Sequence, residues 1–252
     1  AWHTRSPLAQ PLSRAQGLGL TPLLPMEPQP EPQALSPQIA WPKAEGVQRA
    51  GVFGGAFDPP HQAHVALVEA AIEQLQLDLV HVLPTGQAWH KPRDLTPPVH
   101  RLAMTRLAFA HLPRVVVDDR EIGRTGPSYT VDTLHELQTQ WPRAQLFLLI
   151  GDDQRRSLPS WHQIDEIGRI AIICAASRDK AVRAWSEDPQ KPAPSTRLFD
   201  TLQARILSLD MPLMPHSATA IRVLAATEQT MTGLVSPAVE RYINEHHLYR
   251  PH

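Results

Sequence analysis

Apolar and polar residues alternate along most of this chain in a pattern typical of a parallel β-sheet whose strands are joined by crossover helices. The strands of such a sheet are buried on both faces, so each is expected as a short apolar run between turn residues. The sequence predicts strands at Gly51–Phe53, Leu79–Leu83, Val115–Val117, Leu146–Ile150 and Arg169–Cys174, and a further ordered segment at Ala204–Leu209. The charged stretch Asp118–Glu121 follows the third of these strands.

The stretches between the apolar runs carry apolar residues at helical spacing. One such stripe follows the first strand and consists of Val65, Val68, Ile72 and Leu75. Further helices are expected at 99–111, from 128–130 onward, at 161–167, from 217–218 onward and from 237 onward. For the last helix, Ser236 is a typical N-cap and proline follows it at the first helical position. The whole pattern predicts an α/β fold, a Rossmann-like doubly wound parallel sheet with flanking helices.

Two segments depart from this pattern. Residues 1–47 are rich in proline, glutamine, serine and alanine and show no sustained periodicity. Such a segment buries too little apolar surface to offset the entropy of ordering it, so we expect a disordered extension without a catalytic role. Residues 179–196 are polar and contain several prolines, which is typical of an exposed loop. Residues 48–252 are expected to form the catalytic domain.

The composition narrows the function classes. The chain has 252 residues, with 24 Lys and Arg against 25 Asp and Glu, and its net charge is −1. Nucleic-acid binders carry a basic patch that this chain lacks, so nucleic acid is not an expected partner. The single cysteine, Cys174, lies in an apolar run and is expected to be a buried thiol. The sequence has no apolar run of membrane-spanning length and no signal-peptide pattern, so the expected compartment is the cytoplasm.

The stretch 51–64 carries the clearest candidate chemistry. Gly54 and Gly55 end the first strand and allow a tight turn, and two prolines stiffen the loop that follows. His61 and His64 then begin a helix, so we expect both on one face of its first turn, beside unpaired N–H groups. Helix N-termini of this kind bind phosphate. Because the P-loop and dinucleotide-binding glycine patterns are both absent, the two imidazoles are the expected phosphate ligands.

Three stretches at the expected carboxyl edge of the sheet each allow a functional and a structural interpretation. His90 and Lys91 lie in a proline-bounded loop and offer either a phosphate-binding cation or a solvated lysine. Asp153, close behind Gly151, is suited to a ribose hydroxyl or simply follows the end of a strand. Trp161 is either a stacking platform for a ligand or an anchor in the core.

Two further stretches carry hydroxyl groups at expected helix starts. In Arg124–Thr130 two hydroxyl side chains flank Tyr129, and ordinary helix capping explains them without any ligand. Near the C-terminus, Ser217, Thr219 and Arg222 suit polyphosphate oxygens, or else belong to a capped surface helix. These alternatives stay open for each stretch taken alone.

Taken together, the motifs resemble a known family. The first motif is similar to the nucleotidylyltransferase superfamily signature Gly-Gly-x-Phe-Asp-Pro-x-His-x-Gly-His, with Ala63 in place of a glycine. Over residues 50–250 the ordered motifs resemble bacterial nicotinate-nucleotide adenylyltransferases. That family shows Pro-x-x-x-Pro-Pro-His-Lys/Arg, Arg-x-x-Pro-Ser-Tyr-Thr, Gly-x-Asp, a later Trp, Ile-Ser-x-Thr-x-Ile-Arg and a closing Tyr-Arg. The chain departs from the family at Ala88-Trp89 and at His216.

The resemblance implies a reaction. AMP would be transferred from ATP to nicotinate mononucleotide, giving nicotinate adenine dinucleotide and pyrophosphate in NAD biosynthesis. The mononucleotide phosphate is already an anionic nucleophile, so the protein must align two anions that repel each other and needs no general base. The implied partners are these small molecules, without nucleic acid or membrane. The implied cofactor is Mg²⁺ held mainly by ATP phosphates and water, so no protein metal ligands are expected.

The resemblance also assigns residues to roles. The implied catalytic residues are His61, His64, Lys91 and Arg222. The implied ATP-binding residues are Gly54, Gly55, Phe57, His61, His64, Gly151, Asp153, Ser217, Thr219 and Arg222. The implied nicotinate mononucleotide-binding residues are Thr85, His90, Lys91, Tyr129, Thr130 and Trp161, with the indole of the last stacking on the pyridine ring.

Two other functions remain open at this point. An adenylyltransferase for nicotinamide mononucleotide or another phosphate monoester would share these motifs, because backbone N–H groups can hold a ring carboxylate without any residue signature. A catalytically weak nucleotide-binding protein of the same fold would show Ala63 and the altered 88–89 loop as signs of decay, although the retained phosphate ligands argue against it. The sequence predicts no oligomeric state.

Overall fold

A computed structural model of the chain describes residues 46–86, 95–177, 206–212, 214 and 217–250, without the side chains of residues 152, 153 and 177. The proline-rich segment 1–45 and the whole of the expected loop 179–196 lie outside the described residues, as do His90 and Lys91. The expected boundary between an extension and a catalytic domain near residue 47 therefore stays a prediction.

The centre of the described chain is a six-stranded parallel sheet in which the strand order is β3-β2-β1-β4-β5-β6. The strands are β1 (Arg49–Gly55), β2 (Leu79–Pro84), β3 (Val115–Val117), β4 (Gln145–Ile150), β5 (Ala171–Ser177) and β6 (Ile206–Asp210). This order is that of a doubly wound Rossmann sheet, which binds ligands beyond the carboxyl ends of its strands where the order reverses. Here that point lies between β1 and β4.

Helices connect and flank these strands. They are α1 (Gln62–Gln74), α2 (Pro98–Phe109), α3 (Thr130–Gln140), α4 (Asp152–Ser157), α5 (Ile164–Ile170), α8 (Ala218–Ala226) and α9 (Pro237–Glu245), with a 3₁₀ turn, η2, at Leu158–Ser160. The caps expected for the last two helices are confirmed: Ser217 accepts a hydrogen bond from the N–H of Ala220, and Ser236 accepts one from Val239.

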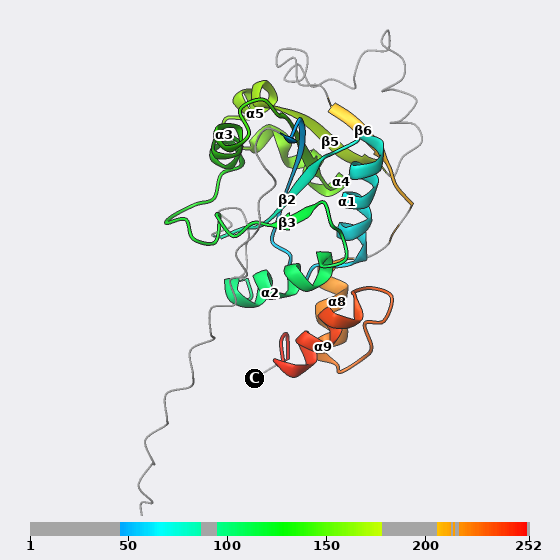
Figure 1. Cartoon of the computed structure of the whole chain (residues 1–252). Coiled ribbons are helices and arrows are strands. Elements are labelled where there is room, and N and C mark those ends of the chain that lie inside the picture. The colour runs from blue at the N-terminus through cyan, green and yellow to red at the C-terminus, as the bar shows by residue number, and fades with distance from the viewer. Residues whose placement is uncertain (1–45, 87–94, 178–205, 213, 215–216, 251–252) are drawn as a thin grey trace, which may run out of the picture. The chain divides into compact units, whose positions relative to one another are not determined.

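Two apolar cores form on the two faces of the sheet. Successive residues of a strand point to opposite faces, so Val52 joins the core beneath α3 and α5 while Phe53 joins the core beneath α1, α2, α8 and α9. Figure 1 shows α3 and α5 on one side of the sheet and α1 on the other. Cys174 is fully buried, as expected, and burial raises the pKa of its thiol to about 12.

Three details of the expected elements are wrong. The helix expected at 161–167 is replaced by η2 and α5, and α4 was not expected. The fifth strand begins at Ala171 rather than Arg169, because Arg169 and Ile170 complete the last turn of α5, where Arg169 pairs with Glu166 at 2.9 Å. An apolar run that ends a helix and starts a strand gives no periodicity by which to place the boundary.

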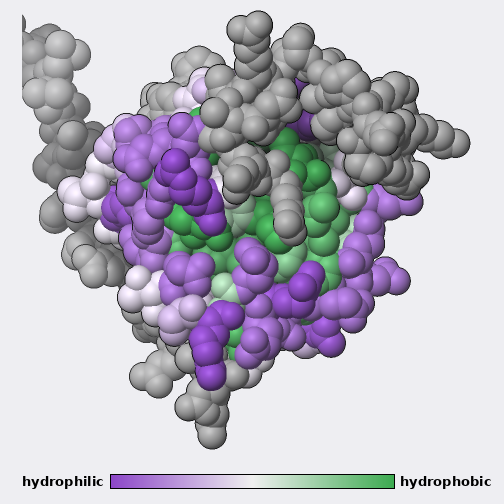
Figure 2. Space-filling view, turned by 90° about the horizontal axis from the view of Figure 1, so that it is seen from above, coloured by the Kyte–Doolittle hydropathy of each residue, from purple (hydrophilic) through white to green (hydrophobic). Residues whose placement is uncertain are grey.

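Figure 2 shows the face seen from above Figure 1, where apolar residues gather centrally and hydrophilic residues lie around them. More than half of an ordinary protein surface is apolar, so this area alone does not define a site. Among the described helices, none is long and apolar enough to cross a membrane.

Candidate active site

The histidine pair lies at the start of α1, as the sequence predicts. His61 is the N-cap of this helix, and its backbone N–H donates a 3.1 Å hydrogen bond to Nδ1 of His64. The two rings stack with their centroids 3.7 Å apart. The expectation that both imidazoles share one face of the first turn is therefore confirmed.

The hydrogen bond within this pair decides what His64 presents to a ligand. Because Nδ1 accepts a backbone proton, the neutral ring carries its own proton on Nε2. Burial, and secondarily the neighbouring His61, hold the pKa of His64 well below its usual value. His64 is thus a neutral N–H donor at a helix N-terminus whose first turn contains no acidic residue. This combination favours an anion.

The loop that joins β1 to α1 is held by contacts from distant parts of the chain. The Asp58 side chain is buried, and its carboxylate accepts hydrogen bonds from the N–H of Thr96 at 3.3 Å and from the hydroxyl of Tyr249 at 2.8 Å. The guanidinium of Arg101 donates to the carbonyl of Ala56 at 2.9 Å. Phe57 is buried in the core, and its ring centroid lies 5.1 Å from that of His64. These contacts fix the loop in front of the histidines.

The C-terminal motif meets the same loop. Arg222 in α8 donates one hydrogen bond to the carbonyl oxygen of Asp58 at 2.8 Å and another to Thr219 Oγ1 at 2.9 Å. Ser217 and Thr219 are exposed at the start of α8. The first and last predicted motifs, far apart in the sequence, therefore lie together at the carboxyl end of β1.

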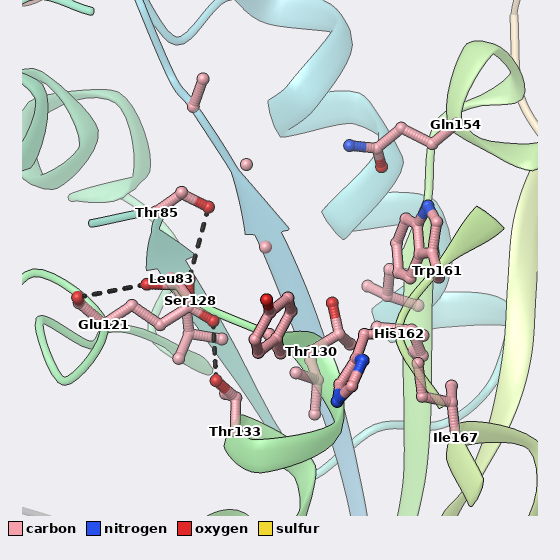
Figure 3. A pocket seen from close by; sticks show the side chains of 17 residues that line it. Leu83, Thr85, Glu121, Ser128, Thr130, Thr133, Gln154, Trp161, His162 and Ile167 are labelled. Atoms are coloured by element: carbon pink, nitrogen blue, oxygen red, sulfur yellow. Dashed lines mark hydrogen bonds between the residues drawn. The ribbon is translucent and has the colours of Figure 1, made fainter. Parts of the chain in front are cut away.

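A pocket opens beside this loop, at the carboxyl ends of β1, β2 and β4 (Figure 3). Six of the residues predicted for nucleotide binding line it: Gly54, Gly55, Thr85, Tyr129, Thr130 and Trp161. The pocket thus joins the glycine turn of β1 to the start of α3 and to the segment after β4.

Aromatic rings form one side of the pocket. The ring centroids of Tyr129 and His162 lie 4.4 Å apart, and Trp161 lies beside His162 in the lining of the same pocket. Trp161 is half-buried and also packs against the core beneath α3 and α5, while its Nε1–H donates to Ser157 Oγ at 3.3 Å. Geometry alone is compatible with both interpretations of this indole.

Sequence reasoning missed several residues of the pocket: Glu121, Ser128, Thr133, Gln154 and His162. Two of them carried a signal. Glu121 follows β3 at the carboxyl edge of the sheet, where open α/β folds bind ligands. Thr133 lies one helical turn after Thr130, so it faces the same side of α3. Ser128 does not cap α3, because Tyr129 is the N-cap; its hydroxyl donates instead to the carbonyl of Glu121 at 3.4 Å.

The remaining predicted residues are placed only in part. Gly151 directly follows β4 and is the N-cap of α4. Asp153 lies in the first turn of α4, and its side chain is not described. Within the described part of the chain, no group of three or more His, Cys, Asp or Glu side chains is arranged to hold a metal ion.

This sheet order is that of a Rossmann-like nucleotide-binding fold, and the histidine pair beyond its first strand suits a phosphate. The model of the cytidylyltransferase-like family matches residues 52–223, so the chain belongs to that family.

Two relatives with substantial sequence identity to this chain have the same name. A protein of Albidiferax ferrireducens is 52% identical over 204 residues, which span 81% of this chain and 99% of the relative. A protein of Methylibium petroleiphilum is 39% identical over 208 residues, spanning 81% and 93%. Both are named probable nicotinate-nucleotide adenylyltransferase. The chain therefore groups with nicotinate-nucleotide adenylyltransferases, as the sequence motifs predicted.

A solved structure gives the same fold. The Plasmodium falciparum nicotinic acid mononucleotide adenylyltransferase complexed with NaAD has a TM-score of 0.62 and 17% identity, covering 80% of this chain and 97% of its own. At this identity the likeness establishes the fold.

Proposed function

We propose that this protein transfers AMP from ATP to nicotinate mononucleotide, forming nicotinate adenine dinucleotide and pyrophosphate. The observation that carries the proposal is the junction of two features: the imidazole donors at the start of α1, and a pocket with an aromatic side that shares the Gly54-Gly55 turn. The first suits a polyphosphate and the second a flat ring attached to a ribose. The sequence identity to the relatives named above supports the same reaction.

The chemistry requires alignment rather than proton transfer. A phosphate oxygen of the mononucleotide forms a bond to the α-phosphorus of ATP, and the bond from that phosphorus to the bridging oxygen of the β-phosphate breaks. Charge moves onto the departing pyrophosphate. The Nε2–H of His64 and the side chain of His61 would stabilise that charge without reorganising, because their positions are already fixed by stacking and by the His61 N–H.

The ATP site would extend from the histidines across the loop to α8. We assign the β and γ phosphates to Arg222, Ser217, Thr219 and Lys91, and the adenosine side to Gly151 and Asp153. Arg222 is supported by its contact with Asp58, which holds the guanidinium beside the loop. The floor of this ATP site would be formed by Gly54, Gly55 and Phe57.

The mononucleotide would occupy the pocket of Figure 3. We assign its ribotide to Thr85, His90, Lys91, Tyr129 and Thr130, and its pyridine ring to Trp161. The support is that Thr85, Tyr129, Thr130 and Trp161 line one pocket although they come from three separate stretches of sequence.

Mg²⁺ is the proposed cofactor. It prefers oxygen ligands and keeps several waters, so triphosphate oxygens and water suffice to hold it beside the described residues, which offer no carboxylate cage. When bound, the ion neutralises charge on the leaving pyrophosphate. The cytoplasm stays the expected compartment.

The test is an assay of pyrophosphate release with ATP and each mononucleotide. We expect a higher kcat/KM with nicotinate mononucleotide than with nicotinamide mononucleotide, and a product with the mass of the nicotinate dinucleotide. A preference for the amide would assign the enzyme to that substrate instead. Release with neither mononucleotide, from folded protein that binds ATP, would contradict adenylyl transfer to either.

A further inference from the structure

Glu121 is the buried acidic side chain of the pocket. It follows β3 and is 6% exposed, and its carboxylate lies between two threonines that line the same pocket (Figure 3). Oε1 accepts a hydrogen bond from Thr133 Oγ1 at 2.8 Å, and Oε2 accepts one from Thr85 Oγ1 at 3.3 Å. One carboxylate thereby links the end of β2 to the second turn of α3.

The backbone of Glu121 also binds residues on this side of the pocket. Its carbonyl oxygen accepts hydrogen bonds from the Ser128 hydroxyl at 3.4 Å and from the N–H of Arg124 at 3.3 Å. Gly86, directly after Thr85, packs so closely that a Cβ there would overlap this oxygen. The segment after β2, the connection from β3 to α3, and α3 itself therefore meet at one residue.

The direction of the hydrogen bonds is fixed by a neighbouring cation. The guanidinium of Arg124 donates to Thr133 Oγ1 at 3.2 Å and to Glu136 at 2.7 Å. Because Thr133 Oγ1 accepts from Arg124, its own proton is free to go to Glu121. Burial raises the pKa of Glu121, while Thr133 and the charge of Arg124 oppose that rise. The carboxyl group is thus held by hydroxyl donors from two separate segments of the pocket lining.

We propose that Glu121 is a positioning residue for the mononucleotide. Through the hydroxyls of Thr133 and Thr85 it holds in place the wall of the pocket against which the ribotide binds, by which we mean the side lined by Thr85, Ser128 and Thr133. This rests on the proposed function, in that the pocket of Figure 3 is taken as the mononucleotide site. Hydrogen bonds to an ionised group are worth more than neutral ones, so loss of the carboxylate loosens Thr85 and the start of α3 together. His61, His64 and Arg222 lie outside the lining of this pocket, so ATP binding is expected to be spared.

The test compares three variants by the KM of each substrate, kcat and the free energy of unfolding. Glu121→Gln keeps the volume and removes the charge; we expect KM for nicotinate mononucleotide to rise roughly tenfold or more while KM for ATP stays within twofold. Thr133→Val is expected to give the same selective rise, and Thr133→Ser, which keeps the hydroxyl, to restore the wild-type value. The matched control is Glu136→Gln, which removes the other carboxylate near Arg124 and lies outside the pocket lining.

Coupling separates positioning from independent contacts. If Glu121 acts through Thr133, the double variant Glu121→Gln/Thr133→Val raises KM no more than the larger single change. Equal rises in both KM values, or lost stability with both KM values unchanged, would show a role in the fold only. A lowered KM for nicotinate mononucleotide would show that Glu121 merely repels the ring carboxylate.

Failure of the proposed function is distinguishable from failure of this inference. If the wild-type protein forms no dinucleotide, the reaction assignment fails. Calorimetric titration of nicotinate mononucleotide into wild type and Glu121→Gln then tests the wall directly, with a selective loss of affinity expected and equal affinities contradicting it.

Discussion

The hydroxyl of Tyr249 donates a 2.8 Å hydrogen bond to Oδ1 of Asp58, which ties the end of the described chain to the loop in front of the histidine pair, 191 residues earlier. Burial, together with the Asp58 carboxylate, raises the pKa of Tyr249, so its phenol stays protonated and remains a donor. The same Asp58 offers its carbonyl oxygen to Arg222. Two C-terminal side chains thus hold one residue of the loop that precedes the histidine pair.

Replacing Tyr249 by phenylalanine tests this tie. The variant leaves a buried carboxylate with one donor fewer, which costs about 1 to 3 kcal/mol of the free energy of unfolding. Turnover is expected to fall as well, because the loop carrying His61 loosens. Denaturant titration and steady-state kinetics measure both. The control is Tyr242→Phe, whose hydroxyl pairs with the imidazole of His100 at 3.0 Å; an effect of equal size there would contradict a special role for Tyr249.

A second buried network predicts how stability depends on pH. The His81 side chain is fully buried; its Nε2 accepts a 3.0 Å hydrogen bond from the Trp141 indole, and its Nδ1 lies 3.0 Å from Asp118. Burial lowers the pKa of His81 below 6.5 despite the attraction of Asp118. As the pH falls below 6.5, His81 becomes protonated in the unfolded chain while it stays neutral in the folded chain. Its contribution to the free energy of unfolding is therefore complete above pH 6.5 and is lost as the pH falls.

His81→Gln removes that titration. Between pH 6 and 5 we expect the slope of the free energy of unfolding against pH to flatten by up to one proton, about 1.4 kcal/mol per pH unit. Asp118 affects stability at a lower pH. Despite burial, hydrogen bonds from His81 and Arg120 lower its pKa to about 2. Its contribution to the free energy of unfolding is therefore lost only below pH 3.8. Urea titrations across this range measure both, and an unchanged slope in His81→Gln would rule out the assigned proton.

The pattern of apolar runs predicted the central strands well because strands such as β2 and β4 are buried on both faces. Val115–Val117 coincides with β3, and the caps of α8 and α9 follow from local chemistry that needs no tertiary context. The start of β5 was misplaced because Ile170 serves a helix and its neighbour a strand, both buried or half-buried. Local patterns do not encode which of two buried environments a residue enters.

The site residues also differ in whether local sequence or tertiary packing sets their positions. Side chains within one motif, such as His61 and His64, were placed correctly because helix spacing alone sets their geometry. Arg222 was selected through the family motif, and its contact with Asp58 exists only after α8 folds onto the loop. Glu121 was noticed only as part of a charged strand end, because its partners Thr85 and Thr133 lie far from it in sequence.

The segment before Gly46 is predicted to be dispensable for catalysis, because every proposed site residue follows Gly51. A chain starting at Gly46 keeps Val47, which is buried in the core beneath α3 and α5. We expect its kcat and both KM values to match the full chain. Circular dichroism establishes folding, and a large loss of turnover in folded, shortened protein would mean that the segment contributes to the site.

His64→Ala is predicted to lower turnover far more than it weakens mononucleotide binding, since the partner proposed for Nε2–H is charge that develops as the α-phosphorus is attacked. Loss of one preorganised donor typically costs roughly 10² to 10³ in rate. The control is His135→Ala on α3, an exposed histidine 3.8 Å from Glu166. Single-turnover kinetics separate chemistry from binding, and turnover within a few-fold of wild type would remove His64 from the proposed mechanism.

Trp161 is predicted to bind the pyridine ring rather than serve mainly as a core anchor. Its indole is half-buried, lines the pocket and lies beside His162 (Figure 3), so part of the ring is accessible from the pocket. Stacking contributes on the order of 1 kcal/mol beyond burial. Trp161→Ala should therefore raise KM for nicotinate mononucleotide several-fold with KM for ATP nearly unchanged, and Trp161→Phe should recover part of the loss. If Trp161→Ala instead unfolds at markedly lower denaturant with both KM values unaltered, the indole is a core anchor, and Tyr129 becomes the ring platform to test next.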